Sequence, residues 1–116
     1  WAILERYRVN PHPAYWLGWG RTSCRACIFG SANQWATLRA FMPEAFGPIA
    51  RHEEAFGVTI QRNRSVVEAA DRGTPYPCDP NWLAIANSHT YRSAIRLPAG
   101  QWRLPPGAFG EAAGPT

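Results

Sequence analysis

Hydrophobic positions recur at helical spacing along several short stretches of the chain. Among the first nine residues, Trp1, Leu4 and Arg8 fall on one face with Ile3 and Tyr7 beside it, which predicts a helix. Two prolines follow within the next four residues, and each disfavours helical backbone in the residue before it. The sequence therefore predicts that this helix ends there and that an extended or turned segment follows.

Two further helices are predicted by their starts. Ser31 with Gln34, and Ser65 with Glu68, each fit the capping box, in which the serine oxygen meets an unpaired backbone amide at a helix start. The predicted helices run to about residue 41 and to near residue 73. A cysteine-containing loop leads directly into the first of them.

A longer helix is predicted between these two. Pro43 opens it, and its apolar positions Phe46, Ile49 and Phe56 recur at helical spacing. Gly57 is expected to close it, because glycine readily adopts the left-handed backbone of a helix carboxyl terminus.

The last predicted helix begins at Asp79 and Pro80, an acidic N-cap followed by a proline in the first helical position, and runs to about His89. From Leu97 onward prolines and glycines dominate, so the tail is predicted to be loop with at most one helical turn. No apolar run is suited to a sheet of its own. The sequence predicts a mostly α-helical chain.

Length and composition refine this expectation. The 116 residues fit one small domain. The sequence starts at Trp1 without an initiator methionine and stops at Thr116 after a glycine-rich stretch, so residues 1–116 are expected to be a single fragment of a longer protein.

No segment approaches the roughly 20 apolar residues that span a bilayer. We expect a cytoplasmic location and no membrane partner.

The charge balance favours anionic partners. All twelve basic residues are arginine, and the net charge is +4 with a pI of about 9.4. The arginines are scattered and form no dense run, so phosphate or sulfate groups are the expected ligands. Nucleic acid is possible as a partner but is not indicated.

Cys24 and Cys27 form a Cys-x-x-Cys pair, whose spacing lets two sulfurs converge on one ion or cluster, or close a redox disulfide. A structural zinc or a cubane cluster needs four ligands, and the chain offers only Cys78 and three histidines besides. The ligand set is therefore incomplete unless another segment contributes. Alternatively, both cysteines are small buried core residues. A thioredoxin-like site is disfavoured, because no βαβ pattern surrounds the pair.

Three residues are candidates for holding an anion. Arg21 lies three residues before Cys24, and a folded loop would bring its guanidinium near the imidazole of His12 and the phenol of Tyr15. The alternatives are a hydrogen-bonded structural role for His12 and a solvated surface charge for Arg21. Arg25 is also expected at the surface.

A family resemblance runs through nearly the whole chain. It covers residues 7–15, with Asn10-Pro11-His12-Pro13, and residues 18–30, with Arg21-Thr22-Ser23-Cys24-Arg25-Ala26-Cys27, and it continues through residues 33–36, Glu53 with residues 56–60, and residues 73–76 and 104–111. In order and spacing these segments resemble the part that follows the nucleotide-binding core in phage and bacterial phosphoadenosine phosphosulfate (PAPS) reductase-like proteins, within the PP-loop superfamily.

The resemblance implies an α/β enzyme whose parallel sheet and phosphate-cradling loop lie outside this chain. Residues 1–116 would then be its helical cap, with Arg21 contacting an adenine sulfonucleotide or ATP, and with Cys24 and Cys27 holding a 4Fe-4S cluster or zinc. The missing amino-terminal half is an implied partner. Unlike assimilatory reductases, the tail at residues 110–114 has no cysteine, which argues against reduction through a thiosulfonate intermediate.

Three hypotheses follow from the sequence. The first is a fragment of a PAPS reductase-like oxidoreductase, inactive by itself. The second is a small metal-stabilised interaction or nucleic-acid-binding module without catalysis. The third is an inert helical cap whose cysteines belong to the core.

Overall fold

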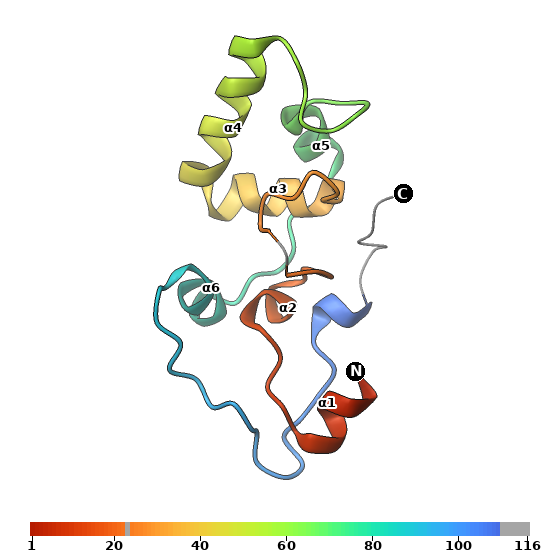
Figure 1. The fold of residues 1–116 in the computed structure, drawn as a ribbon, viewed down its shortest axis with the longest axis vertical. Coiled ribbons are helices and arrows are strands. Elements are labelled where there is room, and N and C mark those ends of the chain that lie inside the picture. Colours follow the sequence, from red (N-terminus) through yellow and green to blue (C-terminus); the bar gives the residue numbers. More distant parts are fainter. Residues whose placement is uncertain (23, 110–116) are drawn as a thin grey trace. The chain divides into compact units, whose positions relative to one another are not determined.

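The computed structural model describes residues 1–22 and 24–109 (Figure 1). Within these ranges the chain is mostly helical, as the sequence predicts, and contains no strand. The elements are α1 (Ala2–Tyr7), α2 (Pro13–Leu17), α3 (Ala32–Phe41), α4 (Pro43–Phe56), α5 (Val66–Arg72), α6 (Pro80–Asn87) and the 3-10 helix η1 (Pro106–Phe109). None of the helices described is long and apolar enough to cross a membrane.

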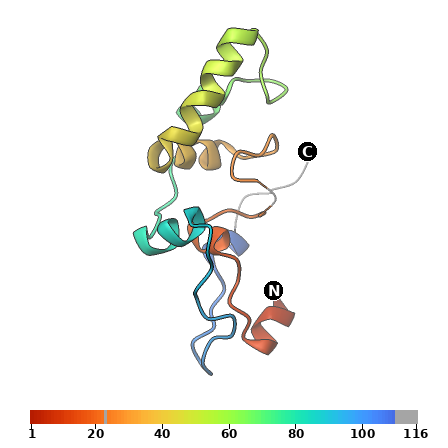
Figure 2. The ribbon, with the colours of Figure 1, turned by 60° about the vertical axis from the view of Figure 1, so that its left-hand side comes forward.

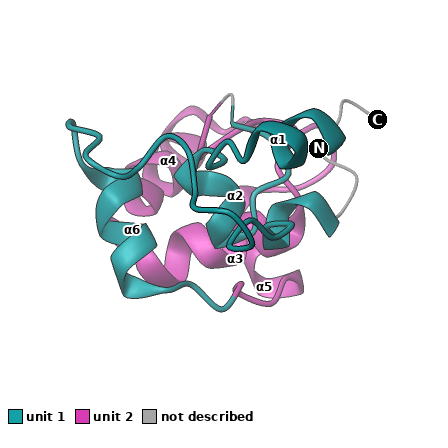
Figure 3. Cartoon of the chain, turned by 90° about the horizontal axis from the view of Figure 1, so that it is seen from below, with its two compact units in different colours: residues 1–22, 77–110 teal, residues 23–76, 111–116 magenta. Residues whose placement is uncertain are grey.

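The described residues form two compact units (Figure 3). Of the described residues, unit 1 contains Trp1–Thr22 and Pro77–Phe109, and unit 2 contains Cys24–Tyr76. The assignment of residues 1–116 to a single fragment of a larger domain stays a prediction.

Unit 2 is built from three helices, with α3 packed against both α4 and α5. Its core combines one aromatic cluster with small and branched side chains that allow the helices to approach closely: Trp35, Ala36, Leu38, Met42, Phe46, Val66, Ala69 and Ala70. The closest approach is at Gly73, where an added Cβ would lie 2.0 Å from the carbonyl oxygen of Ala32. Only glycine fits there without displacing backbone.

The predicted helix ends of unit 2 are confirmed. The Ser31 hydroxyl accepts a hydrogen bond from the Gln34 amide at 3.2 Å, and Ser65 forms a complete capping box with Glu68. Gly57 ends α4 in the left-handed conformation, with φ of 68°. The helix continues through Pro48 between these ends.

Unit 1 contains shorter helices, and one of them is not predicted by the sequence. Helix α2 has only five residues, too few to show a hydrophobic period, and it starts at Pro13 with the His12 side chain capping its amino terminus. The predicted first helix is found as α1, which ends at Arg8 in the left-handed conformation. Helix α6 has the predicted start but ends at Asn87, two residues earlier than expected.

Long-range contacts hold unit 1 together. The extended chain after α6 lies beside the segment joining α1 to α2 in both ribbon views (Figures 1 and 2), and Val9 forms an isolated antiparallel bridge with Arg96. The Trp102 indole donates to the Val9 carbonyl at 2.9 Å. Trp16 and Trp82 stack with their ring centroids 5.5 Å apart.

Candidate functional site

The Cys-x-x-Cys loop consists of two successive turns that lead into α3. The Gly30 amide donates to the Cys27 carbonyl at 2.8 Å, and the Phe29 amide donates to the Cys27 sulfur at 3.4 Å. This hydrogen bond fixes the Cys27 sulfur relative to the turn that precedes α3. A Cβ at Gly30 would lie 2.9 Å from the Cys27 carbonyl oxygen, so this turn depends on glycine.

Both cysteines of this loop are free thiols accessible to solvent. Cys24 is exposed and Cys27 is half-buried. The alternative interpretation, in which both are core residues, therefore does not describe Cys24. A usual zinc or cluster site needs four ligands, so Cys24 and Cys27 alone would leave such a site incomplete. Residues 1–22 and 24–109 contain no group of three or more His, Cys, Asp or Glu side chains able to hold a metal.

Cys78 behaves differently from the pair. It belongs to unit 1, where its sulfur lies 3.9 Å from the Leu17 carbonyl oxygen and donates to it. Burial raises the pKa of the Cys78 thiol to about 11. Cys78 therefore remains a protonated thiol at neutral pH.

The three predicted anion-binding residues all lie in unit 1. The Nδ1 atom of His12 accepts from the Ala14 amide at 3.1 Å, which is the structural role that the sequence left open as the alternative. Tyr15 is linked to His12 through the first turn of α2, and its ring packs edge-on against Trp1 at 4.9 Å. Arg21 is half-buried in the segment after α2. A shared anion between these three side chains stays a prediction.

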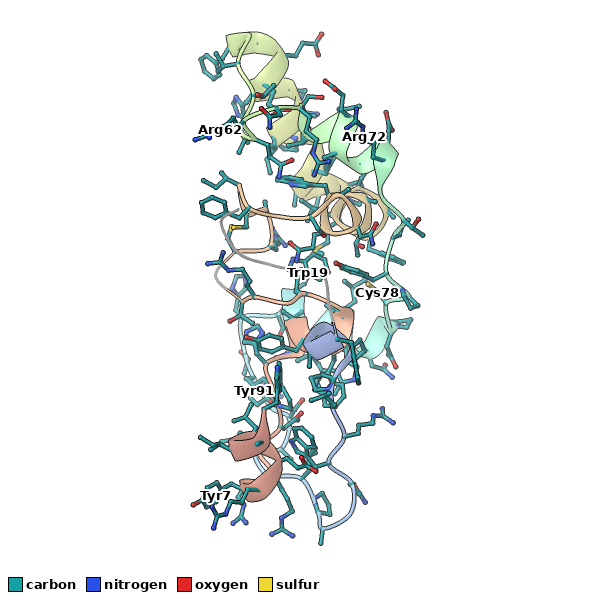
Figure 4. The ribbon with its side chains drawn as sticks, turned by 90° about the vertical axis from the view of Figure 1, so that its right-hand side faces the viewer. Tyr7, Trp19, Arg62, Arg72, Cys78 and Tyr91 are labelled. Atoms are coloured by element: carbon teal, nitrogen blue, oxygen red, sulfur yellow. The ribbon has the colours of Figure 1, made fainter. Side chains whose placement is uncertain are left out.

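Unit 1 also contains a cavity of about 400 Å³ that sequence reasoning missed. Both His12 and His89 line it, together with Asn10 and Tyr91 (Figure 4 labels Tyr91). His89 is exposed and follows α6 by two residues. His89 reaches the cavity through the fold of the chain after α6, so no local sequence pattern indicates that it lies there.

Unit 2 contains a basic groove of about 870 Å³, here called the arginine groove. Three arginines line it: Arg62 and Arg64 from the loop after α4, and Arg72 from the end of α5 (Figure 4 labels Arg62 and Arg72). The loop of the two cysteines contributes Ile28 and Phe29 to the same groove. Sequence reasoning missed this site, although Arg62 and Arg64 are only two positions apart.

Comparison with protein-family models, with curated proteins and with solved structures found no match to this chain. The tail at residues 110–116, in which the sequence has no counterpart of the reductase cysteine, lies outside the described residues.

Proposed function

We propose that this chain is the carboxy-terminal, helical-cap part of a PP-loop enzyme that handles an adenine sulfonucleotide or ATP and resembles PAPS reductases. In this proposal Cys24 and Cys27 hold an iron-sulfur cluster or a metal ion. The nucleotide-binding half, with its parallel sheet and phosphate loop, is supplied by another segment.

The observation that carries the proposal is the geometry of the cysteine loop. Cys27 receives an amide hydrogen bond on its sulfur, Cys24 is exposed, and neither thiol is in a disulfide. The turn at Cys27 is closed by a backbone hydrogen bond, in which the Gly30 amide donates to the Cys27 carbonyl. Two accessible thiols on such a loop are suited to binding a metal or cluster whose other ligands come from elsewhere.

Each candidate residue has a defined part in this proposal. The two thiolates anchor the cluster or ion, which would supply the redox or Lewis-acid chemistry. Arg21 contributes a fixed positive charge that is suited to a sulfate or phosphate group. His12 and Tyr15 shape the surroundings of that group from the first turn of α2, since His12 already uses Nδ1 to cap the helix.

Metal analysis tests the proposal. The full-length protein that contains this chain, purified without oxygen and reconstituted with iron and sulfide, or with zinc, is expected to retain metal, and Cys24→Ser and Cys27→Ser are each expected to lose most of it. Cys78→Ser is the matched control and should retain metal like the unchanged chain. Equal metal retention by all three variants would show that the Cys24–Cys27 loop is not the site.

A second function shares the same loop, namely a small metal-stabilised module that binds partners without catalysis. The small size of the unit that contains the cysteines favours it, because many small metal-binding domains fold only with their metal. Chelation separates the two functions. A structural metal predicts that unit 2 loses its helical circular dichroism on chelation, whereas the enzyme proposal predicts that α3, α4 and α5 persist.

A further inference from the structure

The arginine groove has a basic wall and an apolar wall. Arg62, Arg64 and Arg72 provide the positive charge, and Ile28, Phe29 and Ile60 provide the apolar surface. The three apolar side chains are 52%, 43% and 41% exposed, respectively, so their surface is accessible to a ligand in the groove. Its volume of about 870 Å³ lies within the usual range for small-molecule sites.

The positive charge of this groove is not neutralised by its acidic neighbours. Asp71, adjacent to Arg72, instead pairs with Arg39 at 2.7 Å. Glu68 is engaged in the capping box of α5. None of the three groove arginines forms an ion pair with another described residue, and the residues lining the groove include no aspartate or glutamate.

The loop that carries two of these arginines is held in place by the buried carboxylate of Glu53. One oxygen of Glu53 accepts from the Ile60 amide at 2.9 Å, and the other accepts from the Val66 amide at 2.8 Å. Both ends of the loop are thereby fixed to α4. A site fixed before its ligand arrives loses less conformational entropy on binding.

Gln61 connects this loop to the cysteine loop. Its Nε2 atom donates to the Ile28 carbonyl at 3.1 Å and to the Gly30 carbonyl at 2.8 Å. Its Oε1 atom accepts from Nε of Arg64 at 3.2 Å, which orients that guanidinium while its Nη groups take no part in the bond. The arginines are therefore positioned relative to the loop that contains Cys27.

We infer that the arginine groove is a nucleotide site distinct from the anion position proposed at Arg21, and that it binds an adenine nucleotide with its phosphate or sulfate groups on Arg62, Arg64 and Arg72 and its base on the apolar wall. The identity of the ligand rests on the proposed function, whereas the position of the anion site rests on the groove itself. Planar guanidinium groups pair well with phosphate and sulfate oxygens. An apolar wall beside them is suited to a purine ring and not to an inorganic anion alone.

Titration of the 116-residue chain tests this inference. ATP and adenosine phosphosulfate are expected to bind, and adenosine, which has no anionic group, is expected to bind at least tenfold more weakly. Arg62→Ala and Arg72→Ala should each lower the affinity for both nucleotides by about tenfold to a hundredfold. Arg51→Ala, which removes an exposed arginine of α4 outside the groove, is the matched control and should change the affinity little.

A second variant, Glu53→Gln, tests whether nucleotide binding depends on the fixed position of the arginine-bearing loop or only on the net charge near the groove. This substitution removes a negative charge near the groove, so a purely electrostatic site would bind anions more tightly. The amides of Ile60 and Val66 each donate to a different oxygen of Glu53, and glutamine has only one side-chain oxygen, so one of these two hydrogen bonds is lost. The inference therefore predicts weaker nucleotide binding. Circular dichroism confirms that each variant still contains its helices.

The outcomes distinguish the groove from the proposed function. If nucleotides bind equally to the unchanged chain and to both arginine variants, the groove inference fails and the proposed function stands. If sulfate binding depends on the groove arginines but nucleotides bind no more tightly than sulfate, the groove is an anion site only and the assignment of an adenine nucleotide to it fails. Tighter binding of a single-stranded oligonucleotide than of ATP, lost in the same variants, would overturn the assignment of the ligand.

Discussion

The two units of this chain are stabilised in different ways. Unit 2 has a continuous helical core in which Trp35, Leu38 and Val66 are almost completely buried. Unit 1 has shorter helices and relies on individual contacts between residues far apart in sequence, such as the hydrogen bond from Trp102 to Val9. The comparison indicates that core substitutions will dominate the stability of unit 2, and single close contacts that of unit 1.

The largest expected change in the free energy of unfolding comes from a substitution in the core of unit 2. Trp35 is 1% exposed and packs against Phe46 with ring centroids 6.4 Å apart. Trp35→Ala is expected to lower the free energy of unfolding by about 3 to 5 kcal/mol, because it leaves a large cavity. Urea denaturation followed by circular dichroism measures the change. Trp1→Ala, at a residue 42% exposed, is the control and should have a much smaller effect.

A close contact should be the most sensitive point of unit 1. A Cβ at Gly107 would lie 2.0 Å from the Trp19 carbonyl oxygen, so Gly107→Ala must move backbone and is expected to cost about 1 to 3 kcal/mol. Gly100→Ala is the matched control, because nothing lies within 4 Å of its added Cβ and only the positive φ of 79° opposes it. Equal unfolding midpoints for the two variants would contradict the close packing of η1 on α2.

A smaller effect is expected at the helix caps. Ser65→Ala removes the acceptor of the capping box in unit 2 and should cost about 1 kcal/mol. Ser65→Asp keeps an acceptor at the same position and should recover most of that loss. Thermal unfolding of both variants measures these changes in stability. Identical losses of stability in the two variants would show that the cap does not stabilise α5.

The smallest expected effect is a pH dependence in unit 1. The pKa of Cys78 is raised by burial from its ordinary value of about 9 to about 11. Between these values the unfolded thiol loses its proton while the folded thiol keeps it. The stabilisation is complete below pH 9 and falls as the pH rises towards 11.

The difference between unchanged chain and Cys78→Ala isolates this contribution. Urea midpoints measured at pH 8 and pH 10 should fall more steeply for the unchanged chain than for the variant. Parallel pH dependence in the two proteins would show that the Cys78 thiol is as exposed in the folded chain as in the unfolded one.

Sequence reasoning succeeded where the determining residues are neighbours. The serine and glycine ends of α3, α4 and α5 are set by residues within one turn, so capping patterns located them. It failed for α2, whose five residues carry no period. It also missed the arginine groove and the unit 1 cavity, because Arg72 joins Arg62, and His89 joins His12, only through the folding of the chain between them.

The most direct test of the central claim is to read the coding sequence upstream of Trp1. The proposed function predicts an open reading frame that encodes a Ser-Gly-Gly-x-Asp-Ser type loop directly after a strand, since such a loop cradles the phosphates of the nucleotide. An upstream frame that encodes no glycine-rich phosphate loop would contradict the assignment to the PP-loop superfamily.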